Sequence, residues 1–160
     1  MRLHTIAGAA LCFFAACAPA APPKSALPPV TKEDGDRVAQ EMAADGSRLD
    51  VPALVKFIPQ TDRIVYVSDT NPISGKGYAK DIGDFYKTLS KLDYHWDSLQ
   101  SLPISDNAVI VTGWASITTV PLKGKAESVR AIVTSVYVRD STGWKRVISH
   151  KTTIPSPKRG

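Results

Sequence analysis

The chain has 160 residues, a formal net charge of +5, 43% hydrophobic residues and 22% charged residues, as expected for one globular domain. Its basic residues are spread singly, without a run of five and without aromatic–basic repeats, so we expect no nucleic-acid partner. The only cysteines, Cys12 and Cys17, lie near the N-terminus. This excludes a disulfide framework, a thiolate metal site and a cysteine nucleophile from the rest of the chain.

Residues 1–17 have the pattern of a secretory signal peptide: a positive start, then an apolar stretch ending in small residues. The stretch is too short to serve as a permanent membrane span. The run Phe14-Ala15-Ala16-Cys17 resembles the lipobox of bacterial lipoproteins, with Phe14 where leucine is usual. This resemblance implies lipidation of Cys17 and a membrane-anchored lipoprotein of the cell envelope. The alternative is cleavage after Ala18-Pro19-Ala20, which would release a soluble periplasmic or secreted protein.

The remainder divides into three parts by composition. Residues 18–30 are rich in alanine and proline, which predicts an extended tether. Residues 31–154 carry the periodic apolar patterns of a folded domain, and residues 155–160 are expected to form a flexible tail.

Within the domain, helices are predicted before most of the strands. Thr31, with Asp34 three residues later, predicts the start of a helix that ends near Gly46. Asp50 is expected to cap a short second helix over residues 51–57.

A β-branched and aromatic segment, residues 63–69, predicts the first strand, and residues 70–77 a loop. Apolar residues at helical spacing over residues 78–92 predict a third helix. Four further strands are expected over residues 94–102, 108–120, 128–139 and 144–154. Helices followed by successive antiparallel strands indicate an α+β domain with its helices on one face of a twisted sheet.

Several local strings in this order resemble the nuclear transport factor 2-like superfamily, specifically its SnoaL-like branch. The strings are LVKFI at 54–58, IVYVSD at 64–69, GKG at 75–77, NAVIVTG at 107–113, VTSVYVR at 133–139 and GWKRVISH at 143–150. The resemblance covers residues 31–154. It implies a cone-shaped curved antiparallel sheet, three N-terminal helices packed on it, an enclosed pocket and homodimers formed through the sheet.

Strand alternation places Trp144, Arg146, Ile148 and His150 on one face of the last strand, and the resemblance implies that this face lines the pocket. The full set of expected pocket residues is Trp96, Trp114, Tyr137, Trp144, Arg146 and Ile148. The aromatic members would line a pocket or pack a core.

A buried Arg146 would need an acidic partner or an anionic ligand, because an unpaired buried charge is costly. Asp69, Asp93 and Asp97 are the candidate partners. Alternatively, Arg146 extends to the rim of the pocket and keeps its charge in water.

Two residues are candidates for catalysis. His150 is a candidate general base, and Tyr66 could supply a phenol, as in the ketosteroid-isomerase-type enzymes of the same superfamily. His150 could instead close the sheet end by bonding to neighbouring backbone. Ser135 stands where an active enzyme often carries an acid, which weakens a proton-shuttle mechanism. The spacing of acids and histidines indicates no metal site, and no phosphate-binding loop stands out, so we expect neither metal nor cofactor.

Three functions follow. The first is an exported SnoaL-like domain that binds a small apolar molecule in the cone pocket. The second is an isomerase or dehydratase that uses His150 and Tyr66. The third is an envelope interaction module that dimerises through its sheet. The fold alone does not choose between them or decide whether the protein is an enzyme.

Overall fold

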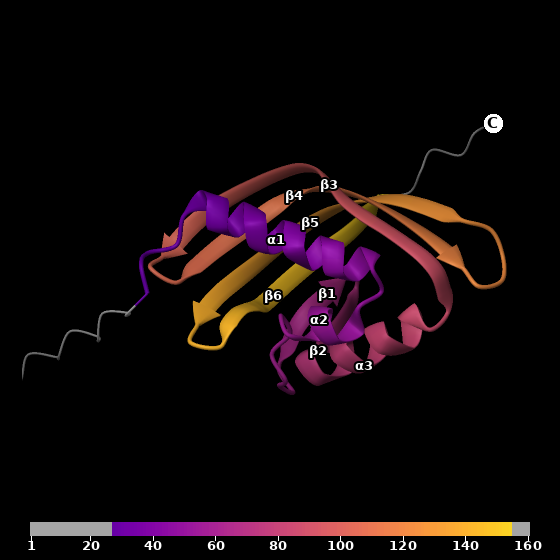
Figure 1. Ribbon diagram of the computed structural model, residues 1–160, viewed down its shortest axis with the longest axis horizontal. Coiled ribbons are helices and arrows are strands. Elements are labelled where there is room, and N and C mark those ends of the chain that lie inside the picture. The colour runs from indigo at the N-terminus through magenta and orange to yellow at the C-terminus, as the bar shows by residue number, and fades with distance from the viewer. Residues whose placement is uncertain (1–26, 155–160) are drawn as a thin grey trace, which may run out of the picture.

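The structure, a computed structural model, describes residues 27–154. Three helices and six strands follow one another along the chain (Figure 1). They are α1 (Lys32–Ser47), α2 (Val51–Val55), β1 (Ile64–Ser68), β2 (Asn71–Ser74), α3 (Gly75–Tyr86), β3 (Leu89–Ser105), β4 (Ala108–Pro121), β5 (Glu127–Asp140) and β6 (Gly143–Ile154). The predicted α+β architecture, with helices packed on a curved sheet, is confirmed. Within residues 27–154, no helix is long and apolar enough to cross a membrane.

The six strands form one sheet in the order β2-β1-β6-β5-β4-β3. Neighbouring strands are antiparallel except β1 and β6, which pair in parallel with Tyr66 opposite Ser149. The sheet is therefore mixed, with one parallel pair among mostly antiparallel neighbours. Antiparallel neighbours can be joined by a short hairpin, whereas parallel neighbours require a long connection. The chain between β1 and β6 contains α3 and all the other strands, so no hairpin constrains this pair.

The first two helices start where the sequence predicts, whereas α3 starts at Gly75 rather than at residue 78. Thr31 accepts a hydrogen bond from the backbone N–H of Asp34, and the Asp34 side chain accepts one from the Thr31 N–H, which completes a capping box at α1. Asp50 caps α2 through the N–H of Ala53. Because each cap satisfies N–H groups that lack partners within the helix, it fixes where the helix begins.

The region between the second and third helices differs from expectation. Residues 71–74, expected as a loop, form β2 at the edge of the sheet, where Pro72 is tolerated because it need not donate to a neighbour. The helix α3 ends at Tyr86 rather than at residue 92, and Leu89 and Leu92 lie buried in β3. A register shift between Leu89 and Lys91 turns both leucines inward. Two residues three positions apart therefore share a face in this bulged strand, as they would in a helix.

The core lies between α1 and the inner face of the sheet. Figure 1 shows α1 crossing this face, with α2, α3 and β2 gathered at one end. Val38 and Met42 of α1 pack with Val109 and Val111 of β4. Gly35 permits the close approach, since a Cβ there would lie 2.7 Å from Cγ2 of Val109. Together, α1 and the sheet position the side chains that line a cavity, which lies at the end of the sheet near α2 and α3.

Candidate functional site

A cavity of about 80 Å³ lies between α1 and the inner face of the sheet. All five tyrosines of the chain line it: Tyr66, Tyr78, Tyr86, Tyr94 and Tyr137. The other lining residues are Ala39, Met42, Ala43, Gly46, Leu54, Trp96, Val133, Ser135, Arg146 and Lys151. The lining thus combines aromatic surface with two basic side chains, and within residues 27–154 no aspartate or glutamate belongs to it.

A β-bulge in β6 decides which side chains reach the cavity. Val136 of β5 pairs with Ile148, but the next residue, Tyr137, pairs with Arg146, so Val147 is the extra residue. The bulge reverses the alternation beyond it. Arg146 is 8% exposed and faces inward, whereas Ile148 is 49% exposed and His150 is also exposed. Ser149 and Lys151 take the inward positions instead.

Ile148 and His150 are therefore wrong as pocket residues, because simple alternation does not hold across the bulge. The candidate catalytic pair is separated as well. Tyr66 lines the cavity, and His150 lies in solvent on the outer face.

A second bulge separates the tryptophans. Trp96 pairs with Ala115 and Ser98 with Trp114, which leaves Asp97 as the extra residue of β3. Trp96 faces the cavity and donates from its indole nitrogen to the carbonyl oxygen of Ala39 at 3.2 Å. Trp114 lies on the outer face beneath the guanidinium of Arg130, 4.7 Å from its ring centroid. Trp114 is therefore wrong as a pocket residue, because its neighbour in β4, Ala115, takes the inward position.

Trp144 also lies outside the cavity lining. It packs against the edge of the core, and the guanidinium of Arg139 lies 5.5 Å from its ring centroid. Of the expected pocket residues, Trp96, Tyr137 and Arg146 line the cavity. Three lining tyrosines were missed: Tyr78 and Tyr86 of α3, and Tyr94 of β3.

Arg146 is the charged group buried deepest in this site. Its guanidinium carbon lies 4.9 Å from the ring centroid of Tyr78 and 5.2 Å from that of Tyr66. Its backbone N–H donates to the carbonyl oxygen of Phe57 at 2.7 Å, which ties β6 to the segment that follows α2. The buried Nη2 atom finds no hydrogen-bond partner among residues 27–154. Aromatic contact offsets part of the cost of burying this charge, but it leaves Nη2 without an acceptor.

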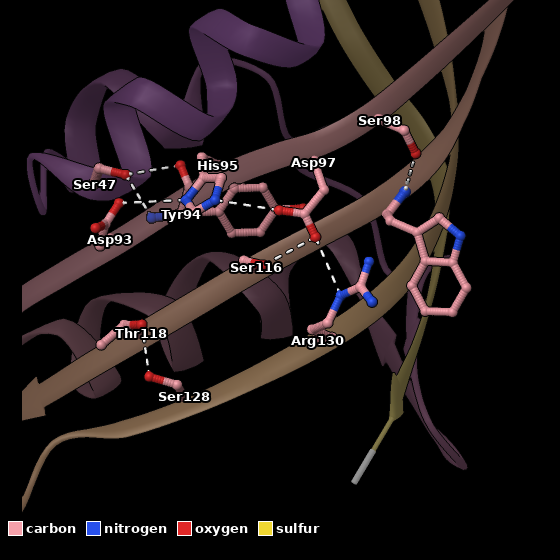
Figure 2. Close-up of polar contacts among 11 residues, drawn as sticks. Ser47, Asp93, Tyr94, His95, Asp97, Ser98, Ser116, Thr118, Ser128 and Arg130 are labelled. Atoms are coloured by element: carbon pink, nitrogen blue, oxygen red, sulfur yellow. Dashed lines mark hydrogen bonds and ion pairs between the residues drawn. The ribbon is translucent and has the colours of Figure 1, made fainter. Parts of the chain in front are cut away.

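The three candidate acidic partners lie elsewhere. Asp69 is exposed and accepts hydrogen bonds from the N–H and hydroxyl of Thr153, at 2.7 and 3.3 Å. Asp93 and Asp97 belong to the exposed network on the outer face (Figure 2). Of the two explanations for Arg146, an acidic partner from residues 27–154 does not fit, and neither does a solvated position at the rim.

The outer-face network is centred on Asp97, which accepts hydrogen bonds from Ser116 at 2.9 Å and from Nε of Arg130 at 3.2 Å. His95 lies between two acids, with Nε2 3.2 Å from Asp97 and Nδ1 3.8 Å from Asp93 (Figure 2). The His95 side chain is 62% exposed, so this is a solvated surface network rather than part of the cavity. Nowhere in residues 27–154 do three or more histidine, cysteine or acidic side chains group as metal ligands would.

Four phenols of the cavity keep their protons near pH 7 because they are buried. Burial raises the pKa of Tyr66 to about 12 and also raises the pKa of Tyr86, Tyr94 and Tyr137. Their hydroxyls can therefore donate hydrogen bonds to a ligand but carry no negative charge to balance Arg146.

No family model matches the chain, and no curated protein matches it in sequence. Solved structures match its fold. A nuclear transport factor 2-like superfamily protein from Salmonella enterica aligns with a TM-score of 0.68 and 15% identity, covering 80% of this chain and 94% of that one. A ketosteroid isomerase-like protein from Erwinia carotovora aligns with a TM-score of 0.60 and 16% identity, covering 76% and 94%.

A hexachlorocyclohexane dehydrochlorinase from Novosphingobium barchaimii aligns with a TM-score of 0.58 and 17% identity, covering 79% of this chain and 95% of that one. The domain thus has the nuclear transport factor 2-like fold. At such identities the likeness extends to the fold and not to the activity.

Proposed function

We propose that this protein is an exported, SnoaL-like domain that holds a small, mostly apolar molecule in its cavity. The observation that carries the proposal is the cavity lining, in which five tyrosines, Trp96 and Met42 converge. Ligand sites are mostly apolar concavities with a few polar groups that orient the ligand. The tyrosine rings provide the apolar walls, and their neutral hydroxyls provide the polar groups.

The size of the cavity limits the ligand. At about 80 Å³ it is smaller than the roughly 150 Å³ of a cavity that encloses benzene. A single-ring or short-chain molecule would therefore extend toward the mouth, or displace side chains that line the cavity. Met42, with its flexible thioether, is suited to such an adjustment.

Native mass spectrometry of the protein from its own host tests the proposal. Ala43 lines the cavity, whereas the next residue of α1, Ala44, is exposed. We expect an additional bound mass with the wild-type protein and with Ala44→Phe, but not with Ala43→Phe, because the larger side chain fills the cavity. Absence of a bound mass from the wild-type protein, or its retention by Ala43→Phe, would contradict the proposal.

The proposal includes attachment to a membrane through lipidated Cys17. This rests on the lipobox-like run alone, which lies outside the described residues. Acylation adds about 0.8 kcal/mol of membrane affinity for each buried methylene. We expect the wild-type protein to partition with membranes after cell fractionation, and Cys17→Ser to appear in the aqueous fraction. Cys12→Ser is the matched control and should behave as wild type.

The outer face of the sheet supports a second proposal, a homodimer. Leu102, Ile110, Val136 and Ile148 form one row across β3, β4, β5 and β6. Leu102 is 63% exposed and Ile148 is 49% exposed. Exposed apolar residues that adjoin one another are typical of interfaces.

Light scattering during size-exclusion chromatography tests the dimer. We expect twice the chain mass for the wild-type protein and a monomer for Ile148→Lys. Leu122→Lys, which introduces the same charge at another exposed apolar residue, should remain dimeric. A monomeric wild-type protein would exclude the dimer.

We do not propose an isomerase or dehydratase that pairs His150 with Tyr66. A general base and an oxyanion donor must both reach one substrate. These two side chains lie on opposite faces of the sheet.

A further inference from the structure

We propose that the ligand of this cavity carries a carboxylate and that Arg146 binds it. The inference rests on the proposed binding function and specifies the chemical class of the ligand: a small organic monocarboxylate whose apolar part contacts the tyrosine rings. The structural observation behind it is a buried guanidinium with an unpartnered nitrogen on the wall of the cavity.

The positive charge of Arg146 is costly to bury. Arg146 is 8% exposed, and a buried cation without a hydrogen-bonded anion is strongly unfavourable. The ion pairs of residues 27–154 involve other side chains, and the aspartates considered as partners lie on the surface. An anion that neutralises Arg146 therefore has to come from outside this part of the chain.

The phenol of Tyr66 does not supply that anion. Tyr66 and Tyr78 present their rings to the guanidinium. Burial raises the pKa of Tyr66 to about 12, so its hydroxyl keeps its proton near pH 7. The two rings contact the guanidinium group and leave the hydrogen-bond capacity of Nη2 unused.

The shape of the guanidinium determines which kind of anion fits. A guanidinium is a planar fork of donors that matches the two oxygens of a carboxylate. The second basic residue of the lining, Lys151, lies five residues further along β6, roughly 16 Å of extended backbone away, so the two basic residues enter the cavity from separate points of the strand. One deeply buried arginine among tyrosine rings suits a monoanion better than a phosphate dianion, and the small cavity favours the more compact group.

Titration of the purified protein with benzoate and with benzamide, its neutral isostere, tests the inference. The quenching of tryptophan fluorescence reports binding, because Trp96 lines the cavity. At fixed ionic strength we expect benzoate to bind about 10- to 100-fold more tightly than benzamide, the range of one hydrogen-bonded charge pair. Arg146→Met should remove this preference. Lys91→Met, which makes the same change in net charge at an exposed residue, should retain it.

Arg146→Lys is the second variant, in case Arg146→Met fails to fold as judged by circular dichroism. It keeps the positive charge but lacks the planar pair of donors that matches a carboxylate, so the preference for benzoate over benzamide should fall. Equal binding of benzoate and benzamide by the wild-type protein would overturn the carboxylate assignment and leave the binding function intact. The same holds if benzoate fails to bind while native mass spectrometry shows a retained molecule. Failure of both measurements would overturn both proposals.

Discussion

The hydroxyl oxygens of Ser135 and Ser149 lie 2.8 Å apart on adjacent strands, and both residues are almost fully buried. The register of β5 and β6 places them directly opposite each other. Ser135 also lines the cavity. The two neutral hydroxyls thus hydrogen-bond to each other at a position where an acidic residue would have introduced a charge. This leaves Arg146 as the dominant charge of the inner wall.

The serine pair predicts non-additive effects on stability. Ser149→Ala removes one partner and leaves the Ser135 hydroxyl buried without its hydrogen bond, which should lower the free energy of unfolding by about 1–3 kcal/mol. The double variant Ser135→Ala/Ser149→Ala should cost less than the sum of the single changes, because it leaves no orphaned hydroxyl. Chemical denaturation of the four proteins measures the coupling. Strict additivity would show that the two hydroxyls do not depend on each other.

Arg146 predicts a variant that gains stability. Arg146→Met replaces an unpaired buried charge with an apolar side chain of similar length and should raise the free energy of unfolding of the ligand-free protein by about 1–3 kcal/mol. Loss of the contacts with Tyr66 and Tyr78 offsets part of this gain. Arg130→Met, at an exposed ion pair, should change stability by less than about 1 kcal/mol. A marked loss of stability in Arg146→Met would show that the protein itself compensates the charge.

The order of elements could be predicted because local chemistry determines it. The caps Thr31 and Asp50 depend on hydrogen bonds within a few residues, and the long strands depend on runs of β-branched residues. The end of α3 could not be predicted in the same way. Leu89 and Leu92 have helical spacing, and only their pairing with β4 shows that they belong to a strand.

The cavity was predicted only in part, for a related reason. Tyr137 and Arg146 face inward as alternation predicts, whereas Ile148 and His150 do not. The bulge at Val147 depends on how β6 fits against β5, and no residue in the sequence marks it, since Val147 is neither glycine nor proline. The three tyrosines that were not predicted, Tyr78, Tyr86 and Tyr94, are the remaining tyrosines of the chain and lie in α3 and β3. Their residue type was the one signal in the sequence that could have identified them.

Two glycines predict opposite effects of the same substitution. A Cβ at Gly113 of β4 would lie 2.0 Å from the carbonyl oxygen of Ser98, next to the bulge of β3. Backbone must move to admit it, so Gly113→Ala should destabilise the protein by more than about 2 kcal/mol. A Cβ at Gly83 of α3 would meet only Val51, at 3.7 Å. Gly83→Ala should stabilise the protein by about 0.5–1 kcal/mol through helix propensity, and thermal denaturation compares the two.

The buried phenols predict loss of stability at alkaline pH. Burial raises the pKa of Tyr66 from 10.0 to about 12 and raises that of Tyr86, Tyr94 and Tyr137. Their contribution is complete below pH 10, where folded and unfolded phenols are both protonated. Above pH 10 the unfolded chain loses these protons first, so the free energy of unfolding should fall by about 1.4 kcal/mol per pH unit for each phenol.

For Tyr66 this decline should end near pH 12, the pKa in the folded state. Denaturant unfolding at several pH values measures the slope, and Tyr66→Phe should make it shallower by the share of one group. Ultraviolet absorbance of phenolate follows the titration of the native protein. If these four tyrosines ionised near pH 10 in the folded state, the phenols would be solvated, and both the apolar cavity and the unneutralised charge of Arg146 would lose their physical basis.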